Sequence, residues 1–530
     1  MIRVNYRLPT SLQDSLSTMG MPGSTNWIDE PIGREWELEV VEELWAKRGG
    51  VLVVLHGQPG IGKTTLLNYW LKQAKLPVLR WDVKPEAGRR QVQAFSRTIG
   101  PSEHSKTSVA SNPALTDWNG IWQYLARLTK SGRKLVMIDE YTDLRPIGHY
   151  PRSRGVLTNA DWDGLLKASD MCLVLTTSNH KRVIQEFLSY WQAPLYQRAY
   201  LLELKPWRYG MTAKIFPTWS PAERVALYTA LSGVPALWRA IDPGKSLQEN
   251  LVGLLREDSL LHRRVSHLLR DISYQRGSLD AILKALASGM STQAEVAGFT
   301  GLPQGTVSKR LGDLVRAEYV EFQWDAGSPE GRSISRYYLE DPFLRFYYTF
   351  LLHLGRAPFG CEIQHVQDEV RRTLEHLIEQ HTWPALCGEW VLAAGLAGQL
   401  PVDPYGLEFM RPISNYSVAN FVRINQTCGE FILGRCIWQG VPDQAELLRQ
   451  LRESIDACVP WQGTWRLHLF GFARHGWGRE AQAYFRDLIT SGLKGRNWQL
   501  KSANLFDLER VDSGLTAWLD VDYQRYRLAE

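Results

Sequence analysis

The residues best suited to chemistry in this chain of 530 residues lie in one glycine-rich loop. The loop follows the apolar run 51–55, and the next segment, 66–71, carries apolar residues at helical spacing. Glycines let backbone N–H groups turn inward around phosphate oxygens, and the amino end of a helix favours anions. We therefore expect a phosphate chain to be held by Gly57, Gln58, Pro59, Gly60, Ile61, Gly62, Lys63, Thr64 and Thr65.

Two side chains of this loop have separate expected roles. Lys63 would reach the β- and γ-phosphates of a nucleotide, and the hydroxyl of Thr64 would take a coordination position on Mg²⁺. A glycine-rich turn that binds nothing is the alternative. The order strand, loop, helix favours a nucleotide site.

A pair of acidic residues, Asp139-Glu140, follows another apolar run at 135–138. If that run is a buried strand, both carboxylates lie at its carboxyl end, where ligands of open α/β sheets bind. Asp139 would hold Mg²⁺, directly or through water, and Glu140 would polarise an attacking water as a general base. The alternative is that the pair caps the amino end of a helix.

The elements that must position these side chains form an α/β sheet. Five apolar runs separated by helical stretches predict parallel strands in a three-layer arrangement. The runs cover residues 51–55, 77–81, 135–138, 171–176 and 199–204. The fourth run ends in the hydroxyls of Thr176, Thr177 and Ser178, which can contact a γ-phosphate or simply end the strand. Residues 86–118 are polar and basic, and we expect an exposed excursion with a short helix there.

The character of the sequence changes along the chain, which predicts several domains. A helical segment without strand-like runs follows the sheet. Three short amphipathic helices with two strands come next, and then aromatic-rich helices and alternating strands. The expected division is an arm at 1–24, a nucleotide-binding core at 25–205, a helical lid at 206–270, a winged helix-turn-helix at 271–345 and a second α/β domain at 346–530.

The predicted winged helix raises the question of nucleic-acid binding. Its recognition helix would cover 304–316, and the candidate DNA contacts on it are Thr306, Ser308, Lys309 and Arg310. Residues 271–345 contain eight basic and ten acidic side chains, which is unfavourable for a surface that seeks phosphates. The wing can therefore serve as a duplex DNA contact or as a protein–protein hinge.

Charge, cysteine content and hydrophobic runs indicate which partners and which cellular compartment to expect. The net charge of +5 permits contact with nucleic acid without requiring it. The six cysteines include no C-x-x-C pair, which argues against a zinc site or a disulfide framework and favours a reducing compartment. No run of 18 apolar residues and no secretory signal occurs. We expect a soluble cytoplasmic protein with no membrane partner.

Several motifs together resemble a known family, the archaeal-type prokaryotic ATPases of the STAND class within the AAA-like P-loop proteins. Besides the glycine loop, the motifs that carry the resemblance lie at Gly33–Leu38, Met137–Glu140, Leu175–Ser178, Ala193–Arg198, Ser232–Pro235 and Tyr337–Leu351. The resemblance covers nearly the whole chain. It implies an AAA-like sheet of the additional-strand type, and it implies ATP as the nucleotide.

The resemblance also implies roles for residues outside the loop. Arg34 and the turn with Gly233 and Pro235 would border the adenine, and Ser178 would be the sensor polar group. Arg198 would sense the γ-phosphate or act as a finger that stabilises its charge, and a plain surface arginine is the alternative.

The C-terminal domain is similar to the restriction-endonuclease-like, PD-(D/E)XK, domains that many of these ATPases carry. The motif strand, however, has Arg435 and Ile437 where glutamate and lysine are needed, and Asn420 or Ala419 where aspartate is needed. An arginine opposes a hard cation at that place. We expect an inactive nuclease-like domain, although a different carboxylate pair, Glu389 with Glu430, is the alternative.

The sequence thus supports two functions. The first is an ATP-hydrolysing signal-transduction switch, dependent on Mg²⁺, whose nucleotide state controls the appended domains. The second is an ATP-responsive DNA-binding regulator in which hydrolysis is secondary. A protein partner or self-association fits either function.

Overall fold

The computed structural model describes residues 31–519 apart from 76–77, 100–114, 148–155, 190–192, 255–259, 273–275, 326–333, 355–362, 405–406, 411–418, 441–442 and 461. The predicted arm at 1–24 lies outside the described residues. The chain forms two compact units, one ending at Pro206 and the other starting at Trp207. No helix in the described part of the chain is long and apolar enough to cross a bilayer.

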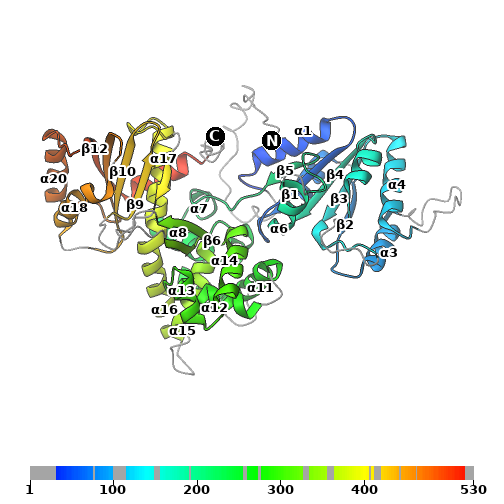
Figure 1. Ribbon diagram of the computed structural model, residues 1–530, viewed down its shortest axis with the longest axis horizontal. Coiled ribbons are helices and arrows are strands. Elements are labelled where there is room, and N and C mark those ends of the chain that lie inside the picture. The colour runs from blue at the N-terminus through cyan, green and yellow to red at the C-terminus, as the bar shows by residue number, and fades with distance from the viewer. Residues whose placement is uncertain are drawn as a thin grey trace. The chain divides into compact units, whose positions relative to one another are not determined.

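The first unit is built on a five-stranded sheet with the strand order β2-β3-β4-β1-β5 (Figure 1). Its strands are β1 (Val51–His56), β2 (Val78–Asp82), β3 (Lys134–Asp139), β4 (Met171–Thr177) and β5 (Tyr200–Glu203). Every neighbouring pair is parallel, which confirms the predicted parallel sheet. Strand β4 lies between β1 and β3, so the sheet has the additional strand of AAA-like P-loop folds.

Helices cover both faces of this sheet. They are α1 (Glu35–Ala46), α2 (Lys63–Ala74), α3 (Gly88–Ile99), α4 (Trp118–Leu128), α5 (Asn159–Asp161) and α6 (His180–Val183), with π-helical turns at Trp162–Leu166 and Ile184–Leu188. Val51, Val53 and Leu55 of β1 pack with α1 and α2, whereas Leu52 and Val54 pack with α3 and α4. A strand buried on both faces requires this alternation, because its side chains point to opposite sides in turn.

The segment after β2 differs from the expected exposed excursion. Helix α3 packs against the sheet, and its Val92 and Phe95 are fully buried. The Phe95 ring lies 4.6 Å from the ring of Trp81, measured between centroids, within the larger core cluster. The basic residues of α3 obscure its apolar face in the sequence, which Val92 and Phe95 mark at positions i and i+3.

The second unit begins with helices. These are α7 (Met211–Ile215), α8 (Pro221–Leu231), α9 (Pro235–Trp238), α10 (Leu247–Leu254) and α11 (Leu260–Ile272). Three more helices follow, α12 (Arg276–Ala287), α13 (Gln293–Thr300) and α14 (Gln304–Arg316), and then the antiparallel pair β6 (Val320–Asp325) and β7 (Ile334–Leu339). The expected three helices and two strands are therefore present, and their identification as a winged helix stays a prediction.

The remainder of the second unit is a mixed sheet with helices. Helices α15 (Pro342–Leu354), α16 (Ile363–Leu377) and α17 (Trp383–Leu396) precede a sheet of order β12-β11-β10-β9-β8. Its strands are β8 (Glu408–Met410), β9 (Phe421–Asn425), β10 (Glu430–Ile437), β11 (Trp465–Ala473) and β12 (Trp498–Asp507). Strands β8 to β10 are antiparallel, and β10 to β12 are parallel. Helices α18 (Gln444–Glu453), α19 (Ile455–Cys458), α20 (Arg479–Thr490) and α21 (Leu508–Ala517) complete it.

A buried ion pair joins the first helices of this unit to its last helix. The guanidinium of Arg224 on α8 lies 2.5 Å from the carboxylate of Asp512 on α21, and both side chains are about nine-tenths buried. The hydroxyl of Tyr209 donates to the same carboxylate at 2.7 Å. Burial, and then Asp512, raise the pKa of Tyr209, so the phenol stays protonated as a donor. The pair holds together segments almost 300 residues apart in sequence.

We predict that Asp512→Ala destabilises the second unit by about 3–5 kcal/mol, because it leaves a buried guanidinium without its counter-charge. Urea unfolding followed by tryptophan fluorescence measures this loss. Asp242→Ala is the matched control, since the exposed Asp242 carboxylate contacts Lys245 and the backbone N–H of Gly244, and its removal should cost far less than that of Asp512. Equal effects of the two substitutions would contradict the prediction.

Candidate functional site

The glycine loop lies at the carboxyl end of β1 and leads directly into α2, as the sequence predicts. Gly60 and Gly62 have φ of 76° and 101°, a left-handed backbone that residues with a Cβ rarely adopt. At Gly57 a Cβ would lie 2.4 Å from the carbonyl oxygen of Leu204, which follows β5. The loop therefore requires glycine for its turn at two positions and for a close backbone approach at a third.

Lys63 is the first residue of α2, and its side chain turns back over the loop. Its ammonium donates to the carbonyl oxygens of Gly57 and Gln58 at 2.9 and 3.3 Å, and to the hydroxyl of Ser178 at 2.8 Å. The residue is 6% exposed. A cation so held at the mouth of a loop of backbone N–H groups is placed to meet phosphate.

Thr64 and Asp139 meet beside it. The Thr64 hydroxyl donates to one carboxylate oxygen of Asp139 at 3.0 Å, and the Thr176 hydroxyl donates to the other. The Arg80 guanidinium lies 3.8 Å from Asp139. A hydroxyl and a carboxylate are the oxygen donors that Mg²⁺ takes in nucleotide sites, so the residues fit the predicted metal. Thr176 thus donates to the carboxylate that is predicted to bind the metal, whereas the sequence left open whether it contacts a γ-phosphate or simply ends the strand.

Glu140 lies between this pair and Lys63. Its carboxylate accepts hydrogen bonds from the backbone N–H of Ser178 at 2.9 Å and from the Ser178 hydroxyl, and lies 3.9 Å from the Lys63 ammonium. Its φ of 52° is left-handed, a strained conformation that residues other than glycine adopt mostly where structure around them enforces it. Ser178, the predicted sensor, thus contacts both the predicted base and the predicted phosphate-binding cation.

Arg34, the predicted neighbour of the adenine, is buried just before α1. Its guanidinium pairs with Glu37 at 2.9 Å and donates to the carbonyl oxygen of Lys205 at 2.6 Å. Gly233 lies in the second unit, where a Cβ would meet the carbonyl oxygen of Trp207, and Pro235 begins α9 there. The joint role of these residues around a base stays a prediction.

Arg198 does not lie beside the loop, so the predicted γ-phosphate sensor within one chain is wrong. It precedes β5, whose Tyr200 is in register with Val53 of β1. Arg198 is therefore level with the start of β1, about 20 Å along the strand direction from Gly57. Its guanidinium binds the carboxylate of Asp163 at 2.7 Å. Only a finger role toward another chain remains as a proposal.

The predicted DNA contacts on α14 separate into two kinds. Ser308 and Lys309 are exposed and Thr306 is partly exposed. Arg310 is 9% exposed and pairs with Asp313 at 3.3 Å. The prediction that Arg310 contacts DNA is wrong, because its guanidinium is buried on the same face as Val307 and Leu311 and is already paired within the helix.

In the C-terminal sheet, the motif strand is β10. Ile437 is buried, and burial lowers the pKa of Arg435 below its usual value. Asn420 accepts a hydrogen bond from the backbone N–H of Cys436 at 2.7 Å, which is a structural role. Glu389 on α17 lies near the buried Tyr228, whose pKa is raised by burial and then by the Glu389 charge. Inactivity of this domain as a nuclease stays a prediction.

The carboxylate of the other acidic candidate, Glu430, already forms an ion pair and a hydrogen bond with neighbouring residues. Its carboxylate pairs with Arg466 at 3.0 Å and accepts from the Asp403 backbone N–H at 2.8 Å. His468 lies 3.9 Å from it and shares a hydrogen bond with Ser502. In the described part of the second unit, no three side chains of metal-ligating type gather closely enough to hold an ion.

No family model matches this chain. The uncharacterized protein MJECL04 of Methanocaldococcus jannaschii is 25% identical over 360 residues, which cover 66% of this chain and 75% of that protein. This similarity assigns no family, and the relative's printed description assigns no activity.

Several solved structures are similar to part of this chain. The Walker-type ATPase paby2304 of Pyrococcus abyssi matches with a TM-score of 0.44 and 18% identity, over 59% of this chain and 95% of that one. The ORC2 protein of Aeropyrum pernix matches at 0.37 with 14% identity, over 66% and 97%. The RuvB branch migration motor of Thermotoga maritima matches at 0.29 with 16% identity, over 64% and 99%. Such low similarity adds nothing to what this chain's strand order and loop establish, an AAA-like P-loop fold.

We predict that His468 remains neutral down to a pH of about 4, because burial and then the charges of Arg466 and Lys501 lower its pKa to about 4. An NMR titration of the imidazole measures it. In the unfolded chain this histidine has a pKa of about 6.5, so it binds a proton at a higher pH than it does in the folded chain. The free energy of unfolding should therefore fall as the pH drops from about 6.5 to about 4. His475, which is exposed, is the internal control. Titration of His468 near 6.5 would contradict the prediction.

Proposed function

We propose that the first unit binds ATP with Mg²⁺ and hydrolyses it. The observation that carries this proposal is the contact of the Thr64 hydroxyl with the Asp139 carboxylate at 3.0 Å, next to Lys63 at the mouth of the glycine loop. Mg²⁺, when bound, would neutralise charge on the phosphates and orient them. Thr64 and Asp139 would hold it, and Lys63 with the loop's N–H groups would hold the phosphate chain.

Glu140 is the general base of this proposal. It can accept a proton from a water that attacks the terminal phosphate, and the N–H and hydroxyl of Ser178 fix its carboxylate in place. The same hydroxyl accepts a hydrogen bond from Lys63. A terminal phosphate that attracts Lys63 would therefore alter the hydrogen bonds of Ser178 and, through them, the orientation of Glu140. This gives the site a physical means to respond to the γ-phosphate.

The switch role is the finer part of the proposal. It is supported by the motifs shared with the STAND-class ATPases and by the Lys63–Ser178–Glu140 contacts that can sense one phosphate. In it, the nucleotide state of the first unit controls the three helices and hairpin and the C-terminal sheet of the second unit. We propose that this C-terminal domain is nuclease-like and inactive, and serves as a scaffold for a protein partner or for self-association.

We predict that Lys63→Ala lowers ATP affinity at least about 100-fold, since it removes the buried cation that faces the phosphates. Glu140→Gln should retain binding within about threefold and lose at least 100-fold in turnover, because its amide cannot take a proton. Binding is measured by calorimetry with ATP and Mg²⁺, and turnover by phosphate release.

Lys72→Ala and Glu43→Gln are matched controls, because both residues are exposed on helices α2 and α1 of the same unit. Neither should change binding or turnover. Hydrolysis by Glu140→Gln at the wild-type rate would show that Glu140 is not the base.

The second candidate function is an ATP-responsive DNA-binding regulator. It is supported by one observation, the exposed Ser308 and Lys309 on α14, with Thr306 partly exposed beside them. Because Arg310 is buried and paired, a single basic side chain of that set is available to phosphate. One available basic side chain gives little attraction for a phosphate backbone. The ATP-driven switch is therefore the better supported function.

For this candidate we predict that Lys309→Ala weakens duplex binding and lowers the slope of log affinity against log salt by about 0.9, the value for one phosphate contact. Fluorescence anisotropy with a labelled duplex, measured over a range of salt concentrations with and without ATP, gives the slope. Lys284→Ala, an exposed lysine on α12, is the control. If the wild type shows no affinity for duplex DNA at low salt, this candidate function is wrong, and the three helices and hairpin would serve as a protein contact instead.

A further inference from the structure

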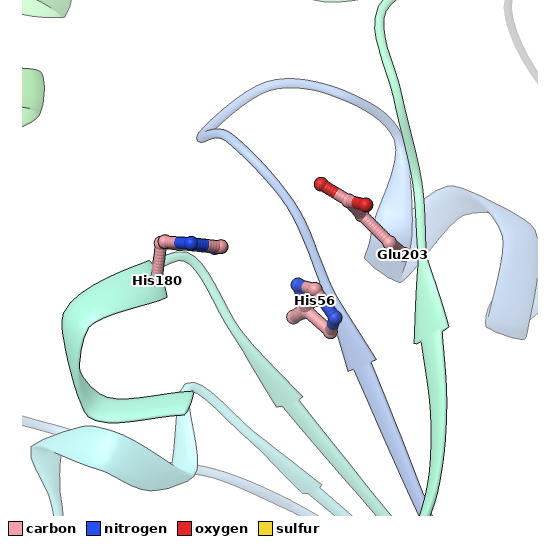
Figure 2. A group of neighbouring side chains, drawn as sticks. All are labelled: His56, His180 and Glu203. Atoms are coloured by element: carbon pink, nitrogen blue, oxygen red, sulfur yellow. The ribbon is translucent and has the colours of Figure 1, made fainter. Parts of the chain in front are cut away.

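Two histidines and a glutamate converge at the edge of the first unit's sheet, beside the phosphate loop (Figure 2). His56 ends β1, Glu203 ends β5, and His180 begins α6 shortly after β4. Strands β4, β1 and β5 are neighbours in the sheet, and His56 is in register with Glu203. The parallel sheet therefore places three residues that are far apart in sequence at one point.

The three side chains are close enough to share a ligand. One atom from each, an imidazole nitrogen or a carboxylate oxygen, lies within 4.8 Å of the corresponding atoms of the other two. Figure 2 shows the His180 ring and the Glu203 carboxylate extending from opposite sides toward the space next to His56. The ring centroids of His56 and His180 are 6.1 Å apart, and they are tilted rather than stacked. The rings thus present nitrogens to a common space instead of packing on each other.

His56 supplies an independent indication of a ligand. The residue is 5% exposed, and its Nδ1 is buried with no hydrogen-bond partner in the described part of the chain. Buried polar atoms of folded proteins are nearly always paired, because an unpaired one loses its hydration without compensation. An ion bound to this nitrogen would supply the missing partner.

The chemistry of these donors selects the ion. Two imidazoles and one carboxylate form the ligand set of several zinc sites, with a fourth position left for water or another ligand. Mg²⁺ prefers oxygen donors, so the Thr64–Asp139 pair and this cluster suit different metals. Tetrahedral ligands of zinc lie about 3.4 Å apart. The ligand atoms must therefore approach one another by at most about 1.4 Å, which the partly exposed side chains of His180 and Glu203 can accommodate.

We propose that His56, His180 and Glu203 form a binding site for one zinc ion, separate from the Mg²⁺ site of the proposed ATPase. The site does not depend on hydrolysis. His56 directly precedes Gly57 of the loop, and His180 follows Ser178 by two residues. A bound zinc ion therefore links the start of the phosphate loop to the segment that carries the Ser178 contact with Lys63.

The test is zinc binding to the full-length, metal-free protein without nucleotide, measured by titration against a competing chelator. We expect one zinc ion per chain. His180→Ala and Glu203→Gln should each weaken binding at least tenfold, which is the loss that even an outer-shell partner of a metal can cause. Co²⁺ in place of Zn²⁺ should give the strong visible absorption of a tetrahedral site, and both variants should lose it.

Controls separate this site from others. His475→Ala and Glu43→Gln change exposed residues outside the cluster and should leave zinc binding unchanged. Asp139→Asn should also leave it unchanged, because that carboxylate belongs to the Mg²⁺ site. Circular dichroism of each variant verifies its fold, and neither ligand variant changes a fully buried residue.

Three results would overturn the proposal. The first is a wild-type chain that binds no zinc, and the second is zinc affinity unaffected in both His180→Ala and Glu203→Gln. The third is a loss confined to Asp139→Asn, which would place the ion at the Mg²⁺ site. Because nucleotide is absent from the experiment, failure here leaves the ATPase proposal standing, and loss of ATP turnover in the Glu140 variant does not bear on zinc.

Discussion

The hydrogen bond between the Thr64 hydroxyl and the Asp139 carboxylate spans a gap that the sheet itself creates. Thr64 belongs to the helix that follows β1, whereas Asp139 ends β3, and β4 lies between them. Strands β1 and β3 are two strand spacings apart, roughly 9–10 Å. Residues of β4 and of the segment after it therefore lie between the two halves of the site. Thr176 donates to Asp139, and Ser178 joins Glu140 to Lys63. The additional strand is thus part of the chemistry as well as of the fold.

The nucleotide site could be predicted from the sequence because each part of it is local. An apolar run, a glycine loop and an acidic pair are short patterns, and the parallel sheet then brings their ends together. Arg198 was misplaced because its motif does not show at which end of a strand it lies, and the register of β5 with β1 decides that. The charge of Arg310 and its place on the predicted recognition helix made it a candidate DNA contact, although its spacing from Val307 and Leu314 marks the buried face of α14. The histidine–glutamate cluster left no pattern, because its members are single residues at positions 56, 180 and 203.

Donor chemistry distinguishes the proposed Mg²⁺ site from the proposed zinc site at the same sheet edge. Hydroxyl and carboxylate oxygens lie on one side of the loop, near β3, and imidazoles with one carboxylate lie on the other, near β5. Mg²⁺ prefers the oxygen ligands, whereas zinc also binds imidazole nitrogen. Each metal can therefore occupy its own site. Ser178, which contacts Lys63 and Glu140, and His180 belong to the same short segment after β4, so a metal at either proposed site would act on that segment.

The central claim is that Asp139 and Thr64 hold the metal of a bound nucleotide. Electron paramagnetic resonance of Mn²⁺, a substitute for Mg²⁺ at oxygen sites, tests it directly with a non-hydrolysable ATP analogue present. Wild-type protein and analogue should bind one Mn²⁺ together, and Asp139→Asn should weaken that binding at least about tenfold while analogue affinity without metal stays the same. Equal Mn²⁺ affinity of the wild type and Asp139→Asn in the ternary complex would contradict the account.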